Sequence, residues 1–404
     1  MKKKTIADVD PLWIGGHTVV VRADLNVPLA GGDVSDDQRI RASLPTLRVL
    51  CDAGARVVLL SHLGRPKGQA DPEYSLEPVA RRLDRFLEHS VRFVPATDGP
   101  EVSEAVGELR EGGVVLLENT RFHPGETANH PELSTFWAGL GDLFVNDAFG
   151  TAHRAHASTA GLAGAMREKG RQAVAGLLMA RELRYLEGVL RMPDRPFIAI
   201  IGGAKISTKI GVISALLPRV DRLLIGGAMA NTFFRALGLD TGESLVEEDS
   251  VDVAAKLIEE GGESIVLPVD CVVAPEVSED ATTKVVGREE VRGEDKIVDI
   301  GPKTRERFAS MIGGAKVLFW NGPMGVFEME PFARGTIAVA EAVADACDAG
   351  AMGVLGGGDS AAAAERAGVA DRLTHVSTGG GASLELIAGA PLPGVESLSD
   401  IADG

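Results

Sequence analysis

Short apolar segments alternate with amphipathic segments along the first half of the chain. The apolar segments are bounded by Gly, Pro or Asp and predict strands at Thr18–Val21, Arg56–Leu60, Val91–Val94, Val114–Leu117 and Leu143–Val145. Amphipathic segments such as Leu44–Asp52 and Glu77–Leu87 lie between them and predict helices. Continuous apolar strands that alternate with helices are typical of a parallel sheet buried on both faces.

The second half repeats this pattern with more glycine. Its predicted strands are Phe197–Ile201, Arg222–Ile225, Ile265–Val269, Val317–Trp320, Met352–Leu355 and Thr374–Val376. A single hydrophobic core stops growing at about 250–300 residues, and this chain has 404. We therefore predict an α/β fold with two doubly wound, Rossmann-like parallel-sheet domains.

Between the two halves, Ala173–Arg191 has the pattern of a helix that ends before Pro193. We interpret this segment as a connector helix that joins two domains with a cleft between them. An ordinary surface helix of one domain is the alternative. The connector interpretation gives an N-terminal domain at residues 1–172, a connector at 173–191 and a C-terminal domain at 192–385.

Composition and charge argue against several classes of protein. The net charge of −17 argues against a protein that coats nucleic acid or an anionic membrane, because both need a basic surface. The amino-terminal segment meets Asp8 and Asp10 where a signal peptide would be apolar, and no stretch approaches the length of a membrane span. The three cysteines are far apart and form no Cys-x-x-Cys pair, so we expect reduced thiols in a cytoplasmic protein.

Four glycine-rich turns follow strands of the second half and lead into helices. They are IIGGAKISTKI at 200–210, LIGGAMANTF at 224–233, VLGGGDSAAA at 354–363 and VSTGGGASLE at 376–385. Glycine lets backbone N–H groups approach a phosphate, and the helix dipole adds attraction. One such turn is explained by strand packing alone. Four of them, one with Lys205 and Lys209 expected on successive helical turns, favour phosphate binding.

The sequences of these turns can be compared with known nucleotide-binding motifs. Gly-Lys occurs nowhere in the chain, which excludes a P-loop. Gly356-x-Gly358-x-x-Ala361 fits a loose dinucleotide pattern, so a nicotinamide-dependent dehydrogenase stays open as an alternative. Asp359 follows three glycines and could reach a divalent cation on nucleotide phosphates, or it could cap the next helix. Glu328 could accept hydrogen bonds from a ribose.

Polar residues follow the predicted strands of the first half. They are Arg22, Asp24 and Asn26 in VRADLNVP, Arg39 in DDQRIRAS, His62 and Arg65 in SHLGRP, Arg121 and His123 in ENTRFHPGE, and Arg154 between His153 and His156. Loops at the carboxyl ends of parallel strands converge, and Arg, His and Asn there suit a small, multiply anionic molecule. For any one arginine, a surface salt bridge is the alternative. His153 and His156 are expected to be capping or core residues, because no further metal ligand lies nearby.

Nine motifs stand in one order: RADLNVP, SHLGRP, ENTRFHPGE, FVNDAFG, AHRAHAS, GGAKISTKI, WNGPMGVFE, GGGDS and STGGGASLE. In this order and spacing the chain closely resembles phosphoglycerate kinases, from about residue 20 to residue 385. The resemblance implies a reversible phosphoryl transfer from 1,3-bisphosphoglycerate to Mg-ADP, which gives 3-phosphoglycerate and ATP in glycolysis. It also implies direct in-line transfer after domain closure, with Mg²⁺ as the metal and ATP or ADP as co-substrate. We expect a cytoplasmic monomer that binds these small molecules and neither nucleic acid nor membrane.

The resemblance also implies residue roles. The substrate contacts would be Asp24, Asn26, Arg39, His62, Arg65, Arg121 and Arg154. The nucleotide contacts would be Lys205, Lys209, Asn321, Glu328, Gly357, Gly358, Asp359 and Ser360, with Asp359 on the metal. The catalytic groups around the migrating phosphoryl would be Arg39, Lys205 and the N–H groups of Gly379, Gly380 and Gly381. The tail at 386–404 would pack back on the N-terminal domain.

The chain departs from the family pattern around the adenine. Asn231 replaces a common aromatic residue, Ala228 stands at a frequent glycine, and Ile297 occupies a place where many members have glycine. Ser360 replaces the commoner threonine and keeps its hydroxyl. The preference for adenine over guanine is therefore open, and a catalytically silent nucleotide sensor with the same fold is the remaining alternative.

Overall fold

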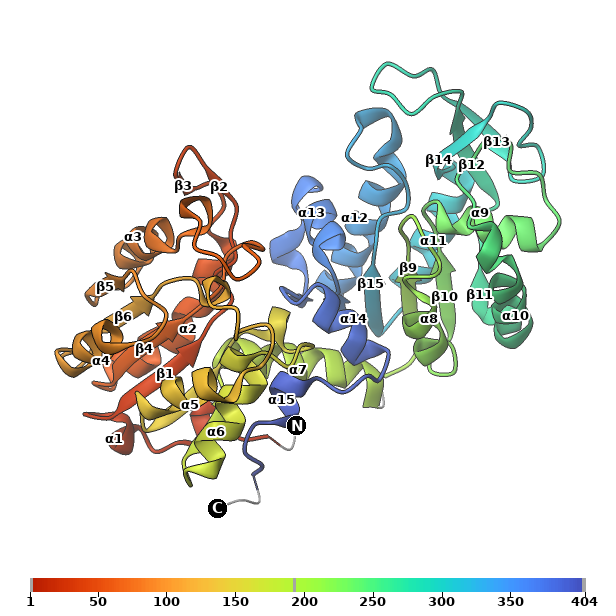
Figure 1. Cartoon of the computed structure of the whole chain (residues 1–404). Coiled ribbons are helices and arrows are strands. Elements are labelled where there is room, and N and C mark those ends of the chain that lie inside the picture. Colours follow the sequence, from red (N-terminus) through yellow and green to blue (C-terminus); the bar gives the residue numbers. More distant parts are fainter. Residues whose placement is uncertain (1–2, 192–193, 402–404) are drawn as a thin grey trace. The chain divides into compact units, whose positions relative to one another are not determined.

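The computed structural model describes residues 3–191 and 194–401 (Figure 1). The expected domain start at residue 192, Pro193 and the last residues of the expected tail lie outside these ranges. The chain divides into two compact units. The first contains residues 3–184 together with the returning segment 391–401, and the second contains residues 185–390.

The first unit is built on a six-stranded sheet in which every neighbouring pair is parallel, in the order β5-β6-β4-β1-β7-β8. Its strands are β1 (Thr18–Arg22), β4 (Arg56–Leu60), β5 (Val91–Val94), β6 (Val114–Leu117), β7 (Leu143–Asn146) and β8 (Gln172–Ala175). Its helices are α1 (Pro11–Ile14), α2 (Gln38–Asp52), α3 (Glu77–Phe86), α4 (Pro100–Gly107), α5 (Pro131–Gly139), α6 (Leu162–Glu168) and α15 (Pro393–Glu396). A short hairpin joins β2 (Leu29–Ala30) and β3 (Asp33–Val34).

The second unit contains another six-stranded parallel sheet, in the order β11-β10-β9-β15-β16-β17. Its strands are β9 (Phe197–Ile201), β10 (Arg222–Ile225), β11 (Ile265–Val266), β15 (Val317–Asn321), β16 (Met352–Leu355) and β17 (His375–Val376). Its helices are α8 (Ile210–Leu216), α9 (Met229–Ala236), α10 (Val251–Gly261), α11 (Pro302–Gly313), α12 (Arg334–Asp348), α13 (Gly358–Arg366) and α14 (Gly381–Ile387).

Both faces of the sheets are covered. In β1, Val19 and Val21 pack in the core cluster that includes residues of α2 and α3, while Val20 points to the opposite face and is equally buried. A strand buried on both faces has no polar side to alternate with, which explains the continuous apolar runs in the sequence. The predicted fold class of two doubly wound parallel-sheet domains is confirmed.

The predicted connector helix begins later than expected. Ala173–Ala175 belongs to strand β8, which pairs with β7, and the helix α7 spans Leu177–Arg191. The helical pattern thus included three buried alanine and valine residues that complete the edge strand of the first sheet. The division between the two units falls inside α7, after Arg184.

A second antiparallel sheet was missed by the sequence analysis. Strands β12 (Asp270–Ala274), β13 (Lys284–Gly287) and β14 (Lys296–Ile300) form it in the order β13-β12-β14. The predicted strand Ile265–Val269 is correspondingly wrong beyond Val266, because the chain leaves the parallel sheet there to enter β12. The edge strand β13 is largely exposed and polar at its ends, so it lacks the apolar run that identified the other strands.

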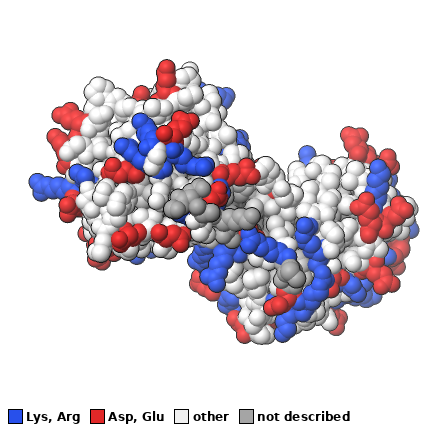
Figure 2. Space-filling view, turned by 90° about the horizontal axis from the view of Figure 1, so that it is seen from below, with Lys and Arg blue, Asp and Glu red and all other residues white. Residues whose placement is uncertain are grey.

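The surface carries both signs of charge. On the face shown in Figure 2, Lys and Arg side chains lie among Asp and Glu side chains, so the net charge of −17 forms no continuous acidic surface there. Within the described residues, no helix has both the length and the apolar character that crossing a membrane requires.

Candidate active site

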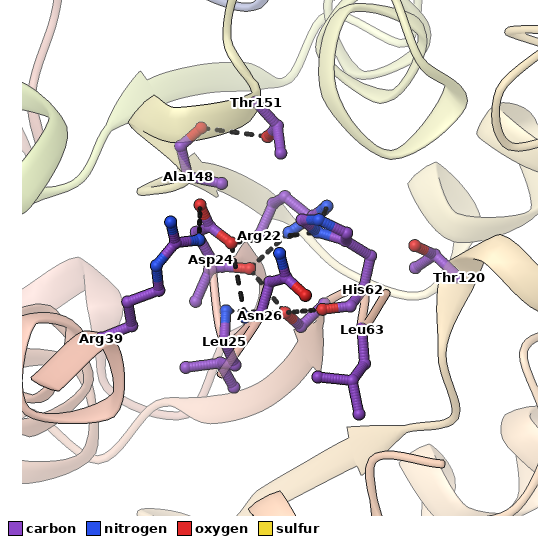
Figure 3. A network of polar contacts seen from close by, with 12 residues as sticks. Arg22, Asp24, Leu25, Asn26, Arg39, His62, Leu63, Thr120, Ala148 and Thr151 are labelled. Atoms are coloured by element: carbon purple, nitrogen blue, oxygen red, sulfur yellow. Dashed lines mark hydrogen bonds and ion pairs between the residues drawn. The ribbon is translucent and has the colours of Figure 1, made fainter. Parts of the chain in front are cut away.

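The loops that follow the parallel strands of the first unit are tied together by short-range hydrogen bonds. After β1, the backbone N–H of Leu25 donates to Ser61 Oγ at 2.9 Å, and Ser61 Oγ donates to the carbonyl of Ala23 at 2.9 Å. Asn26 Oδ1 accepts from the N–H of Gly64 at 2.9 Å. The ends of β1 and β4 are therefore held side by side, and their polar side chains face a common region (Figure 3).

Arg39 lies in the first turn of α2 and is drawn toward the end of β1 by Asp24. Its Nη1 donates to Asp24 Oδ2 at 2.9 Å, and about a third of its side chain is exposed. Asp24 also lies 3.9 Å from Nδ1 of His62 (Figure 3). A partly exposed guanidinium that is oriented by one carboxylate keeps donors available for an anionic ligand.

Arg22 and His62 form the buried floor of this region. Arg22 is fully buried; its Nε donates to Ser158 Oγ at 2.8 Å and its Nη2 lies 3.0 Å from Nδ1 of His62. Burial, and then the charges of Arg22, Arg121 and Arg39, hold the pKa of His62 well below its usual value. His62 is therefore neutral at physiological pH, accepts from Arg22 at Nδ1, and has Nε2 protonated.

Arg121 and Arg154 belong to the same electrostatic cluster. Arg121 Nη1 donates to the carbonyl of Gly64 at 2.7 Å, and burial together with the charge of Arg22 lowers its pKa to about 10. The charge of Arg154 acts on both Arg121 and His156, although its own side chain is exposed. By contrast, Arg65 is exposed, and no interaction within the described part of the chain ties it to the cluster.

His156 is buried at a helical N-cap position, in line with the expected capping or core placement. It stands at the N-cap of the short helical segment Ala157–Gly161, and its Nδ1 lies 3.8 Å from Glu126. Burial lowers its pKa to about 4, against the opposing charge of Glu126. Glu126 is fully buried and accepts from the N–H and the hydroxyl of Ser158 at 2.9 and 2.6 Å. One buried carboxylate thus balances part of the arginine cluster.

In the second unit, Lys209, Asn321 and Ser360 form a network at the carboxyl ends of three neighbouring strands. Lys209 Nζ donates to Asn321 Oδ1, and Asn321 Nδ2 donates to the carbonyl of Gly356. Ser360 Oγ accepts from the N–H of Gly322 at 2.7 Å and donates to the same Gly356 carbonyl at 3.0 Å. Burial lowers the pKa of Lys209. The negative charge of Asp359 acts in the opposite direction but is the smaller effect.

Gly357 is required by this packing. It adopts a φ of 93° at the N-cap of α13, and a Cβ atom there would lie 2.7 Å from Asn321 Nδ2. Asp359 lies in the first turn of α13 and is exposed, and the N-cap position belongs to Gly357. The capping alternative for Asp359 is therefore wrong, and its carboxylate remains available to a ligand.

A cavity of about 270 Å³ lies beside this network. Its wall includes Gly203, Ala204, Gly227, Ala228, Phe234, Pro268, Cys271, Ile297, Asp299, Met324, Glu328 and Asp359. The predicted ribose acceptor Glu328 and metal ligand Asp359 thus share one cavity with Ala228 and Ile297, two of the departures from the family pattern. Asn231 is buried instead, and its Nδ2 donates to the carbonyl of Leu245 at 3.1 Å.

The expected placement of Lys205 on a helix is wrong. Helix α8 begins at Ile210, and Lys205 lies in the preceding loop with its side chain exposed. Lys209 stands at the N-cap of α8. At the start of this loop, the N–H of Gly203 donates to the carbonyl of Pro323 at 3.0 Å.

The glycines before α14 are not equally available as donors. The N–H of Gly379 donates to Ser377 Oγ at 3.1 Å, and Gly380 is the N-cap of α14 with a φ of 49°. Gly381 is the first residue of that helix. In this conformation Gly379 therefore already uses the donor that was expected to face a ligand.

The donor set around Asp359 fits a magnesium ion. Among the described residues, no group of three or more His, Cys, Asp or Glu side chains could hold a metal ion by itself. Mg²⁺ needs no such group, because it is commonly bound through one or two carboxylates, water and the phosphates of a nucleotide. The exposed carboxylate of Asp359 on the cavity wall satisfies that requirement.

Comparison with known proteins decides the family. A family model described as phosphoglycerate kinase matches residues 8–390. The chain belongs to the phosphoglycerate kinase family. It is 55% identical over 406 residues to the phosphoglycerate kinase of Chloroflexus aurantiacus, which covers 99% of this chain and 100% of that protein. It is 53% identical over 400 residues to that of Rubrobacter xylanophilus, with 99% of each chain covered.

Solved structures agree with the family. The phosphoglycerate kinase from Coxiella burnetii superposes with a TM-score of 0.87 at 40% identity, and that from Pyrococcus horikoshii OT3 with 0.83 at 34%; each comparison covers 98% of both chains. As a member of the phosphoglycerate kinase family, the chain is a phosphotransferase of glycolysis with a carboxyl group as acceptor. It uses ATP and ADP as co-substrates. The resemblance drawn from nine motifs is confirmed, and the dehydrogenase alternative is excluded.

Several residues of the phosphoglycerate kinase site were missed from the sequence. Arg22, the first residue of RADLNVP, was named among the strand-end candidates, but its place as a fully buried residue beneath the site was not predicted. Glu126 and Ser158 lie inside the quoted motifs but carry no feature that marks them as buried partners. Asp299 on the cavity wall gave no signal, because its strand β14 was not predicted.

Proposed function

We propose that this phosphoglycerate kinase transfers the phosphoryl group directly, in line, between 1,3-bisphosphoglycerate and Mg-ADP, and that the first unit binds the glycerate while the second binds the nucleotide. The observation that carries the proposal is the convergence of Arg22, Arg39 and Arg121 around the neutral His62. The positive charge of this cluster suits a small acid with one or two phosphates, and the partly exposed Arg39 and Arg121 keep donors for it. Asn26 and Asp24 would accept from the substrate hydroxyl.

In the second unit, the proposal assigns the phosphates of the nucleotide to the turns before α8 and α13. Lys209, held by Asn321, would face the phosphates, with Gly357, Gly358 and Ser360 supplying the close backbone of α13. Glu328 would accept from the ribose. Mg²⁺ held by Asp359 would neutralise phosphate charge when bound.

The transfer step would depend on charge and position, without a covalent phosphoenzyme. Lys205, Arg39 and the N–H groups of Gly380 and Gly381 would surround the oxygens of the migrating group as negative charge develops there. Gly379 would join them only if its bond to Ser377 opens. The acyl phosphate and the nucleotide must also meet with water excluded, which we propose happens by domain closure.

The test is a coupled assay with 3-phosphoglycerate and ATP, applied to the wild-type chain, Arg39→Ala and Lys205→Ala. Removing one donor that acts in the transition state costs on the order of 10²-fold or more in kcat. We therefore expect turnover in the wild-type chain and at least that loss in both variants. Near-normal kcat in both variants would refute these roles.

The sensor alternative has its own outcome in this assay. Saturable binding of Mg-ADP by the wild-type chain without turnover would favour a sensor over an enzyme.

We further propose that the chain acts as a cytoplasmic monomer and binds no nucleic acid. The net charge of −17 supports the last of these points. Sedimentation at working concentration would contradict the monomer by showing twice the expected mass.

A further inference from the structure

The loop that carries Lys205 is fixed firmly at its two ends. At its start, the N–H of Gly203 donates to the carbonyl of Pro323 at 3.0 Å, and the carbonyl of Gly203 accepts from Met229 at 3.0 Å. At its end, Lys209 is held by Asn321. Lys205 lies between these anchors as an exposed residue, and its carbonyl accepts from Thr208 Oγ1 at 2.9 Å. Its position therefore depends on what holds the middle of the loop.

Glu247 reaches the middle of this loop from a distant part of the chain. Its Oε2 accepts from the N–H of Ser207 at 3.0 Å, and its Oε1 accepts from Ser207 Oγ at 2.6 Å. Burial alone would raise the pKa of Glu247. The hydrogen bonds from Ser207 and Ile206 and the charge of Lys205 outweigh that effect and hold the pKa below its usual value. Glu247 is thus ionised and lies within electrostatic reach of Lys205.

The segment 241–247 holds Glu247 in place. The N–H of Glu247 donates to Thr232 Oγ1 at 3.1 Å, and the carbonyl of Leu245 accepts from Asn231 Nδ2 at 3.1 Å, so two residues of α9 fix its end. In the middle of the segment, Ser244 Oγ accepts from the N–H of Ile297 at 2.8 Å. Ile297 lines the cavity described above. The segment therefore connects the cavity wall to the Lys205 loop through directional contacts.

We propose that Glu247 is a positioning residue, which sets the place of Lys205 by holding the backbone of Ile206 and Ser207 from the segment 241–247. This inference rests on the proposed catalytic role of Lys205. Displacement of a catalytic group by about 1 Å can cost on the order of 10²-fold in rate. Losing the anchor should therefore lower kcat, while the groups that bind the nucleotide remain in place.

A purely electrostatic role for Glu247 predicts the opposite result. Its negative charge beside Lys205 disfavours an anionic ligand, so neutralising it would tighten nucleotide binding and leave kcat unchanged or higher. A purely structural role predicts a loss of stability with unchanged kcat per folded molecule. The positioning role alone predicts a lower kcat with an unchanged or lower KM for ATP.

The experiment measures kcat and KM for ATP, together with the thermal unfolding midpoint, in the full chain and its variants. Glu247→Gln keeps one acceptor oxygen and Glu247→Ala keeps none, so we expect kcat to fall in that order, by about 10-fold in the alanine variant. The matched control is Glu248→Gln, which removes the neighbouring carboxylate that faces Arg235 instead of the loop. We expect the control to match the wild-type chain.

Ser207→Ala supplies a second, independent readout. It removes the hydroxyl at 2.6 Å from Glu247 and keeps the backbone N–H. Glu247→Gln leaves one acceptor oxygen for the two Ser207 donors, and Ser207→Ala removes one of these donors. The double variant should therefore lose little more kcat than either single variant. Additive losses of kcat in the double variant would overturn the proposal. An unchanged kcat in both Glu247→Gln and Ser207→Ala would also overturn it. These two variants decide the question if Glu247→Ala does not fold.

The experiment distinguishes a failure of the positioning role of Glu247 from a failure of the proposed catalytic role of Lys205. If the wild-type chain turns over 3-phosphoglycerate and Lys205→Ala is impaired while the Glu247 variants are normal, only the positioning role fails. If the wild-type chain is inactive, or Lys205→Ala is normal, the proposed catalytic role itself fails.

Discussion

Arg22, at the end of β1, differs from the other arginines of the site in having no exposed surface. Its donors are used by Ser158, His62 and the carbonyl of Ala23, and the charge of Glu126 offsets part of the cost of burying it. A buried charge is tolerated when it is paired and hydrogen-bonded. Arg22 therefore orients His62, and its charge adds to the effect of burial in lowering the pKa of that side chain, while the more exposed Arg39 is left to meet the ligand.

Arg22→Met tests this role because methionine fills a similar volume without charge or donors. The change would remove one of the positive charges that act on the buried Glu126 and leave Ser158 without one donor. Removing one partner of a buried ionic cluster costs about 3–5 kcal/mol of unfolding free energy, which urea unfolding would measure. The control is Arg65→Met, where the side chain is exposed and we expect a change within about 0.5 kcal/mol. Equal effects of the two substitutions would contradict the buried role of Arg22.

The contrast between Arg22 and Arg65 also marks the limit of sequence reasoning at this scale. Both arginines lie at or near the end of a strand, so the sequence placed both near one edge of the sheet. What separates them is Ser158, which lies 136 residues further along the chain and supplies the partner that lets Arg22 be buried. Position relative to a strand can be read from the pattern. Burial by a distant segment cannot.

The first turn of helix α7 is hydrogen-bonded to the buried carboxylate of Asp147. Asp147 Oδ1 accepts from the N–H of Met179 at 3.0 Å, and Thr46 Oγ1 accepts from the N–H of Leu177 at 2.9 Å. Gly176 makes room for this arrangement, since a Cβ atom there would lie 2.2 Å from Asp147 Oδ1. The first N–H groups of a helix need acceptors from outside it, and here Asp147, directly after β7, and Thr46 of α2 supply them.

Asp147 makes the stability of the first unit depend on pH. Burial raises its pKa from 3.8 to about 6, against the hydrogen bonds from Thr46 and the helix. Between these values the native state binds a proton that the unfolded state releases, so stability falls as pH rises from 4 to 7. Asp147→Asn keeps an acceptor for Met179 and does not titrate. The wild-type chain loses stability from pH 4 to pH 7 and the Asp147→Asn variant does not lose this contribution. The unfolding free energy of the variant minus that of the wild-type chain should therefore rise over this pH range, by about 3 kcal/mol at most. Urea unfolding at several pH values would measure this, and a constant difference would contradict it.

Elements were predicted well where one physical signal dominated. The parallel strands are buried on both faces, so their apolar runs gave bounds close to those observed, and Arg56–Leu60 and Phe197–Ile201 match without change. The start of α8 could not be found, because the length of the loop after β9 depends on contacts of Gly203 with Pro323 and Met229. Strand β13 could not be found, because an exposed edge strand needs no apolar pattern.

At the scale of the whole chain, the first unit is completed by residues from the opposite terminus. The N–H of Ser399 donates to the carbonyl of Ala173 at 2.8 Å, and Ser399 Oγ accepts from the N–H of Ala173 at 3.1 Å. Asn146 Nδ2 in β7 donates to the carbonyl of Gly394 at 3.0 Å. The segment 391–401 thus hydrogen-bonds to the β7 and β8 side of the first sheet, and Figure 1 shows α15 beside the amino-terminal part of the chain.

Leu398→Ala should reveal whether the two units are separate stability units. Leu398 is fully buried, and replacing a buried leucine by alanine costs about 2–5 kcal/mol. Hydrogen exchange should therefore speed up in β7 and β8 of the first unit, while β15 of the second unit keeps its protection, because local opening follows the unit that lost its packing. The control is Leu257→Ala in α10, a buried leucine of the second unit, for which we expect the reverse pattern. If either substitution accelerates exchange equally in both sheets, the units unfold as one. The returning segment would then stabilise the whole chain instead of the unit it completes.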